Sequence, residues 1–226
     1  MDIHIVVCID EFQQIGEWAD SLTIQKRMRS VWQHQQHISY CLFGSKKHLL
    51  ANLFQNRRMP FYHFGDTIYL KPIPTSDWIP FICEKFVEKG KKISEELVSK
   101  ICSTVASHSS YVQQLAWNIM VNTETEVTDE IFQQSISELL AQCSPLFIQQ
   151  IQGLTTYQMN FIRCLCQGVR KDFTSKDVLE TYQLGSKSNI SRLKKTLVEK
   201  EIIEEEGGTI TLADPIFELW FKREYM

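Results

Sequence analysis

The spacing of hydrophobic and polar positions divides the chain into three regions. In the first region, residues 3–9 form an almost unbroken apolar run rich in β-branched side chains, and residues 37–43 form a second strand-like run. Apolar residues between them recur at helical spacing, at Ile24, Met28, Val31 and Trp32. This order predicts a right-handed, parallel strand–helix–strand unit whose first strand is buried.

Two further segments complete the first region. Residues 46–55 have the periodicity of a short helix, and Asp66–Leu70 has the composition of a third strand. Pro72 and Pro74 then mark a boundary, because proline limits helices and central strands alike. We therefore expect an α/β domain with parallel strands over residues 1–72.

The second region reads as entirely helical. Apolar periodicity and capping residues predict four helices, over residues 77–89, 94–107, 110–121 and 128–151. No strand alternation interrupts them, so we expect an all-α domain over residues 73–151. The whole chain is expected to be mostly helical.

The third region, residues 152–226, begins with three helical stretches and continues into a hairpin signal. The first stretch, residues 154–167, is predicted to turn Tyr157, Phe161, Ile162 and Leu165 inward. A second helix starts at residue 174, and a third runs over residues 187–200. Two strand-like runs around Gly207-Gly208 follow. Three helices and a hairpin in this order predict a winged helix.

Composition places the chain among ordinary globular proteins. Hydrophobic residues make up 43%, charged residues 23%, and the net charge is -3, so bulk charge gives no general attraction to nucleic acid or membrane. No run reaches the length of a membrane span, and the N-terminus lacks a signal-peptide pattern, so we expect a cytoplasmic protein. The seven cysteines are typical of reduced thiols, and the spacing of Cys164 and Cys166 does not favour a metal site.

Polar side chains follow both predicted strands at the point where each strand ends. Asp10 and Glu11 follow the first strand, and Ser45 follows the second. The carboxyl ends of parallel strands meet at one edge of a sheet, so these side chains should lie together. In a P-loop nucleoside triphosphatase the first such acid holds Mg²⁺ and the second polarises the attacking water. A core strand followed by a solvated acidic turn is the alternative.

A loop over residues 56–65 carries Arg57 and Arg58 beside an aromatic cluster. Arginine is suited to meeting the negative charge that develops during phosphoryl transfer, so either residue is a candidate to act within this chain or across a subunit interface. A solvated arginine pair explains the same residues.

The third helix of the winged helix is the most basic helix in the chain. Residues 185–200 contain five basic side chains and one acidic side chain. Its outward positions are candidates for contacts with DNA, at Lys187, Ser188, Ser191, Arg192, Lys194 and Lys195. Three consecutive glutamates at residues 204–206 would repel a phosphate backbone, and residues 152–226 contain eleven basic and eleven acidic side chains. Both nucleic-acid binding and protein docking therefore remain open.

Taken together, the segments V-V-C-I-D-E-F-Q, I-S-Y-C-L-F-G-S-K-K-H, M-P-F-Y-H-F-G-D-T-I-Y-L-K-P-I and D-P-I-F-E-L-W-F resemble the archaeal-type AAA-like ATPases of prokaryotes. That family belongs to the signal-transduction ATPases with numerous domains. The resemblance implies that Asp10 and Glu11 are the Walker B acids and that Ser45 is the sensor-1 residue. It also implies that residues 73–151 form a lid, and that the cofactors are ATP and Mg²⁺.

One departure from this family changes the expected activity. No G-x-x-x-x-G-K-[ST] motif occurs, so the glycine-rich cradle, the phosphate lysine and the Mg²⁺ hydroxyl are missing. We expect either a C-terminal fragment of a longer ATPase or a remnant that has lost catalysis. The chain alone should neither bind nor hydrolyse ATP. DNA, a partner protein or a second copy of the chain are its expected partners.

Overall fold

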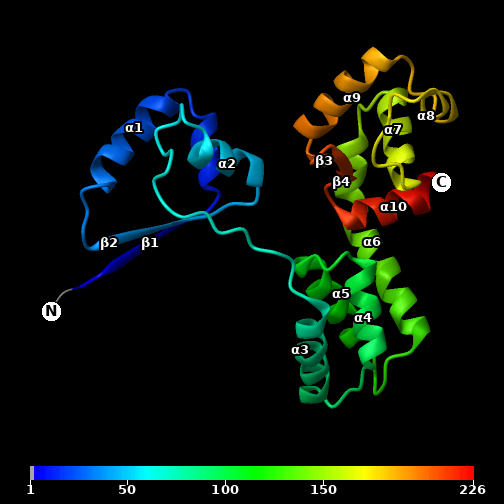
Figure 1. Ribbon diagram of the computed structural model, residues 1–226. Helices are drawn as coiled ribbons and strands as arrows, with labels where there is room; N and C mark the ends of the chain where they lie inside the picture. The colour runs from blue at the N-terminus through cyan, green and yellow to red at the C-terminus, as the bar shows by residue number, and fades with distance from the viewer. Residues whose placement is uncertain (1–2) are drawn as a thin grey trace. The chain divides into compact units, whose positions relative to one another are not determined.

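The chain folds as two separate units in the computed structural model, which describes residues 3–226 (Figure 1). The first unit ends at Leu70. Its elements are β1 (Ile5–Ile9), the 3₁₀ helix η1 (Phe12–Glu17), α1 (Ser21–Trp32), β2 (Ile38–Leu42) and α2 (Lys47–Gln55).

The second unit runs from Lys71 to Met226. Its first four helices are α3 (Thr75–Glu88), α4 (Glu95–Thr104), α5 (Ser109–Asn122) and α6 (Asp129–Ile151). It continues with α7 (Thr156–Cys166), α8 (Lys176–Thr181), α9 (Lys187–Glu199), β3 (Ile203–Glu206), β4 (Thr209–Leu212) and α10 (Pro215–Tyr225).

The first unit is built on a parallel pair of strands, as predicted. β1 and β2 run in register from Ile5 opposite Ile38 to Ile9 opposite Leu42, and α1 makes the connection between them. An aromatic core holds the helices and the following loop together, with Phe12, Leu53 and Phe61 buried at its centre. The Phe12 and Phe61 rings meet edge to face, with their centroids 5.4 Å apart.

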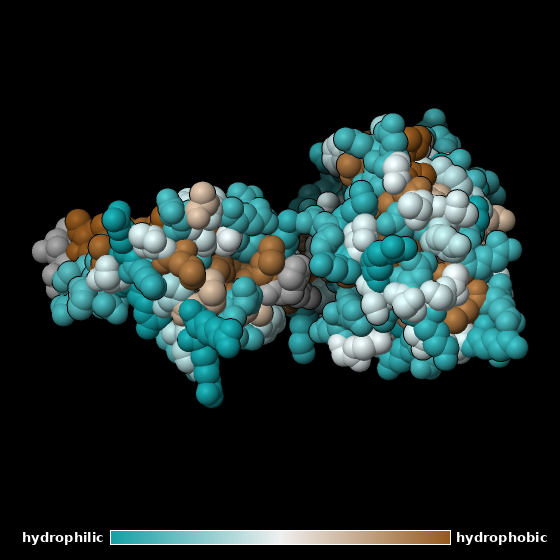
Figure 2. Space-filling view, turned by 90° about the horizontal axis from the view of Figure 1, so that it is seen from above, coloured by the Kyte–Doolittle hydropathy of each residue, from teal (hydrophilic) through white to brown (hydrophobic). Residues whose placement is uncertain are grey.

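Three expectations for this unit are wrong. β1 is not a buried strand, because the described sheet has only two strands: Ile5 is 49% exposed and Val6 is 61% exposed. Figure 2 shows hydrophobic surface beside the grey residues at the start of the chain. Asp66–Leu70 forms no strand and pairs with none within residues 3–226, and Leu70 is 85% exposed. Val31 lies on the outer side of α1, at 56% exposure.

The second unit combines a helical bundle with the predicted winged helix. Ser94 caps α4 and Thr128 caps α6 through side-chain oxygens that accept backbone N–H groups, which satisfies donors that each helix start leaves unpaired. Helices α7, α8 and α9 lead into the antiparallel hairpin of β3 and β4, joined at Gly207-Gly208. The winged helix is therefore confirmed, and α10 follows it as a helix that the sequence analysis did not predict.

The bundle and the winged helix share one hydrophobic core. The Tyr111 hydroxyl on α5 donates a 2.6 Å hydrogen bond to Asp214, which also caps α10. Burial and this carboxylate both raise the pKa of Tyr111, so the hydroxyl keeps its proton. Trp220 on α10 is buried against α6 and donates to Ser144 at 3.0 Å. These contacts join the helical bundle and the winged helix into one unit over residues 71–226. The division of the chain into three domains stays a prediction.

No helix within residues 3–226 is both long enough and apolar enough to cross a membrane.

We expect Trp220→Ala to reduce the free energy of unfolding of the second unit by about 3–5 kcal/mol, because it leaves a cavity between α6 and α10. Ser144→Ala should cost less, about 1–3 kcal/mol, since it removes only the acceptor of the indole N–H. Hydrogen exchange of the α6 and α10 amides in urea would measure both losses. Equal losses would contradict the packing role of the ring.

Candidate functional site

Glu11 and Ser45 meet at the carboxyl ends of β1 and β2. The Ser45 hydroxyl donates to the Glu11 carboxylate at 3.1 Å and 3.3 Å from its two oxygens. Backbone bonds between Phe12 and Phe43 at 3.0 Å, and between Phe43 and Ile9 at 3.1 Å, extend the strand pairing to this point. Parallel pairing therefore brings together two side chains that are 34 positions apart in the sequence.

Gln13 supports Glu11 and was not singled out from the sequence. Its side chain is 2% exposed, and its amide N–H donates to the second oxygen of Glu11. Its own carbonyl oxygen is buried with no hydrogen-bond partner within the described residues. The only signal in the sequence was its position two residues after Glu11.

Gly44 leaves the space that Gln13 occupies. A Cβ atom built on Gly44 would lie 1.8 Å from the Gln13 carbonyl oxygen and 2.9 Å from its amide carbon. Any other residue at position 44 would displace Gln13. The missing side chain at Gly44 thus leaves room for Gln13 to donate its hydrogen bond to Glu11.

Glu11 has an uncommon backbone conformation, with φ at 49° in the left-handed region. This turn lets the Glu11 N–H donate to the Asp10 carboxylate at 2.7 Å. Asp10 itself is exposed. Mg²⁺ is commonly bound by one or two carboxylates, substrate phosphates and several waters, so an exposed Asp10 beside Glu11 fits this ion. The chain has no glycine-rich lysine loop, so its residues alone do not fit the phosphates of ATP.

The two loop arginines are exposed, and the side chains of Arg57 and Arg58 have no partner within residues 3–226 that the structure describes. The arginine that holds this loop is Arg29 on α1. It donates to the carbonyls of Pro60 and Tyr62 at 2.8 Å and 2.9 Å and lies over the Phe64 ring. A phosphoryl role for Arg57 or Arg58 stays a prediction.

The predicted nucleic-acid residues on α9 fall into two groups. Toward the C-terminal half, Lys194 pairs with Glu205 of the wing at 3.5 Å, and Lys195 lies 3.9 Å from Glu199. Lys194 also lies over the Phe173 ring. Lys194 is therefore partly neutralised by the wing, whereas Lys195 and Glu199 are both mostly exposed, so their ion pair is weak.

Toward the N-terminal half of α9, the predicted residues Lys187, Ser188, Ser191 and Arg192 are exposed. Arg192 donates to Asn189 at 2.8 Å, and the Ser188 hydroxyl lies 2.9 Å from that of Ser186. Neither Lys187 nor Arg192 has an acidic partner in the part of the chain that the structure describes. Their positive charge, in the first half of α9, is therefore available to an anion.

Cys164 and Cys166 are buried, and burial raises the pKa of each thiol to about 12. A thiol with so high a pKa is a poor nucleophile and a poor metal ligand at neutral pH.

Comparisons with known proteins show which family model and which solved structures this chain resembles. Residues 145–223 match the family model described as a probable winged helix domain. The structure of the Walker-type ATPase PABY2304 of Pyrococcus abyssi is similar at a TM-score of 0.73 and 16% identity, covering 97% of this chain and 63% of that one. The Aeropyrum pernix ORC2 protein in its ADP form is similar at a TM-score of 0.51 and 12% identity, covering 97% and 64%. No match is found among curated proteins.

The chain has the fold of an archaeal-type AAA-like ATPase with a C-terminal winged helix. The fold that the sequence resemblance implied is confirmed. The chain spans slightly less than two thirds of the length of each similar structure.

Gly44→Ala should displace Gln13 and reduce the free energy of unfolding of the first unit by about 1–3 kcal/mol through overpacking. Gly65→Ala is the matched control, because no atom lies within 4 Å of a Cβ built there and its φ is not positive. Hydrogen exchange around residues 9–16 in urea would compare the two variants. Equal stability of the two variants would contradict the close contact between Gln13 and position 44.

Proposed function

We propose that the first unit supplies the metal-binding and water-activating half of an ATPase site. The hydrogen bond from Ser45 to Glu11 across the strand ends is the observation that carries this proposal. It joins the predicted Walker B acid to the predicted sensor-1 residue, at the edge of a parallel sheet where α/β proteins bind their ligands.

Unpaired strand surface in the same unit supports an incomplete sheet. The exposed side chains of β1 and of residues 66–70, which pair with no described strand, present apolar surface that a larger sheet and the helices packed on it would bury. Ile68 is 82% exposed although its segment has a strand composition. A strand followed by a glycine-rich loop and a helix would both complete the sheet and provide the phosphate cradle.

In this proposal each acid has a separate task. Asp10 would hold Mg²⁺ in its exposed carboxylate, and the bound ion would neutralise phosphate charge. Glu11 orients the attacking water through its carboxylate. Ser45 and Gln13 fix the direction of that carboxylate by donating to its two oxygens. ATP turnover would be coupled to movement of the helical bundle and the winged helix, and we propose that the protein works in the cytoplasm.

Glu11→Gln, made in the protein expressed from its complete open reading frame, should leave ATP binding intact and lower turnover by about 10²–10⁴-fold, because it removes the general base. Glu17→Gln is the matched control, an exposed acid at the end of η1. Phosphate release and nucleotide binding would be measured in parallel. Unchanged turnover in Glu11→Gln would refute the assignment, and we expect the 226-residue chain alone to show no turnover.

Nucleic-acid binding by the winged helix is the second candidate function. The basic start of α9 favours it, and the acidic wing opposes it. Reversing three charges in Arg192→Glu/Lys194→Glu/Lys195→Glu should abolish binding to DNA, and wild-type affinity should fall as salt rises. Fluorescence anisotropy at several salt concentrations would measure both. Undiminished affinity in the triple variant would leave protein docking as the role of this domain.

A further inference from the structure

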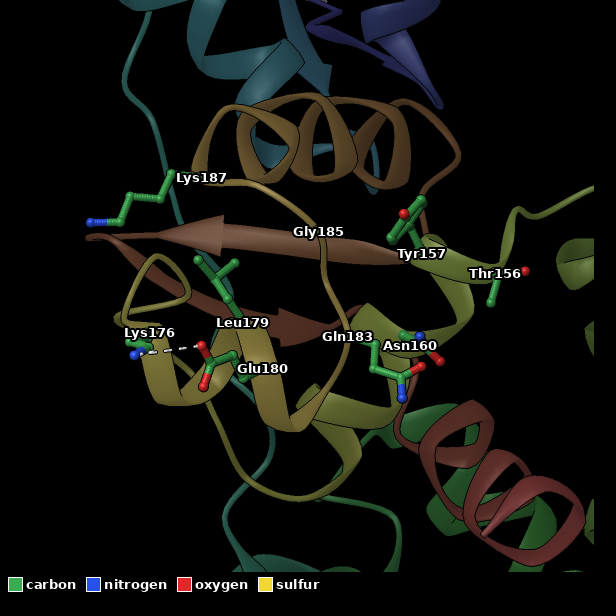
Figure 3. Close-up of a pocket in the computed structure, with 9 residues that line it drawn as sticks. All are labelled: Thr156, Tyr157, Asn160, Lys176, Leu179, Glu180, Gln183, Gly185 and Lys187. Carbon is green, nitrogen blue, oxygen red and sulfur yellow. Dashed lines mark ion pairs between the residues drawn. The ribbon is translucent and has the colours of Figure 1, made fainter.

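A continuous surface hollow lies between α7, α8 and the start of α9. One part has a volume of about 930 Å³ and the adjoining part about 340 Å³, and both are lined by Tyr157 and Gly185. Figure 3 shows α7 residues on one side of the larger part and the α8 residues Lys176, Leu179 and Glu180 on the other. Volumes in this range suit ligands of nucleotide size.

Tyr157 forms the wall that the two parts share. The helical pattern predicted that it faces inward, but it is 48% exposed. Its ring packs beside Gly185, where a Cβ atom would lie 3.3 Å from the ring and where φ is +79°. Gly185 therefore lets the chain pass close to the ring and leaves the rest of the ring exposed. An exposed, laterally fixed aromatic ring is a stacking platform for a planar group.

Cations line both parts of the hollow. Lys187 and Lys176 line the larger part, and Arg192 lines the smaller part. Lys176 lies 3.8 Å from Glu180, but both side chains are mostly exposed, so this ion pair is weak. In the view of Figure 3 the ammonium groups of Lys176 and Lys187 lie toward one end of the hollow and Tyr157 toward the other.

The wing side of α9 is electrostatically unsuitable for a polyanion. Glu204, Glu205 and Glu206 form β3 together with Ile203, and Glu205 already occupies Lys194. A phosphate backbone following the usual path over the wing would meet these carboxylates. The same backbone laid along the hollow would meet Lys176, Lys187 and Arg192, with Glu180 as the one acidic residue among those that line it.

We propose that this hollow binds single-stranded nucleic acid, with one base stacked on Tyr157 and phosphates of the same strand held by Lys187 and Arg192. Stacking on a side-chain ring requires a base that is free of its own duplex neighbours, which favours a single strand over a duplex. The amide and hydroxyl groups of Asn160, Gln183 and Ser186 supply polar contacts around the ring. The site does not depend on the proposed ATPase role of the first unit.

Two double variants of the same helix test the position of the site. Lys187→Gln/Arg192→Gln should weaken binding of a fluorescent oligothymidine by about 10-fold and reduce the magnitude of the salt slope by about 1.4, the value for two lost phosphate contacts on a single strand. Lys194→Gln/Lys195→Gln removes the same charge from the other half of α9. It should leave affinity within about twofold, because Lys194 already pairs with Glu205 and neither lysine lines the hollow.

Variants of Tyr157 separate stacking from charge. Tyr157→Leu should weaken oligothymidine binding by about 5- to 100-fold, the range for one base stacked on an aromatic ring, without changing the salt slope. Tyr157→Phe should restore the affinity, because the ring remains. Circular dichroism of every variant would verify that these exposed substitutions leave the fold intact.

Each of the following outcomes would overturn the proposal. They are equal losses in the two double variants, wild-type affinity in Tyr157→Leu, tighter binding of a matched hairpin duplex than of the single strand, and the absence of any binding at low salt. Displacement of the oligonucleotide by equimolar polyglutamate would also overturn it, because it would assign the hollow to an acidic protein segment. A duplex-preferring result that depends on Lys194 and Lys195 would retain the winged helix as a DNA reader and reject only the hollow.

Discussion

Parallel pairing of β1 with β2 is the constraint on which the candidate site depends. It sets Ile9 opposite Leu42, so the residues that follow each strand emerge at one edge. Glu11 and Ser45 then lie within hydrogen-bonding distance, and Gln13 fills the space that Gly44 leaves open. A change in register by one residue would turn these side chains to opposite faces and separate them.

The two units differ in how completely they bury their apolar surface. The second unit has a continuous core of aromatic and aliphatic residues from α3 to α10. The first has a small aromatic core beneath a sheet with exposed hydrophobic side chains. Exposed strand residues are costly in water, which is why we propose that further strands complete the first unit.

Charge is arranged unevenly within the winged helix although its total is neutral. The ion pair between Lys194 of α9 and Glu205 of the wing neutralises part of the charge in the second half of the helix, whereas Lys187 and Arg192 nearer its start have no acidic partner within the described residues. The exposed Tyr157 lies at this available end. Local pairing, and not the number of lysines, decides which half of the helix can attract an anion.

The sequence by itself determined the strand–helix–strand order, the helical bundle, the winged helix and the acidic residues after β1. Hydrophobic periodicity, and the glycine, proline and capping residues that end each element, are local properties of the chain. Tertiary structure alone decided the rest. The role of Gln13 requires Gly44 from a distant segment, and the pairing of Lys194 requires the wing. Asp66–Leu70 has the composition of a strand but pairs with no strand within the residues that the structure describes. Tyr157 follows a helical pattern that predicted an inward side chain. Its ring packs beside Gly185 at the surface instead, and the residue is 48% exposed.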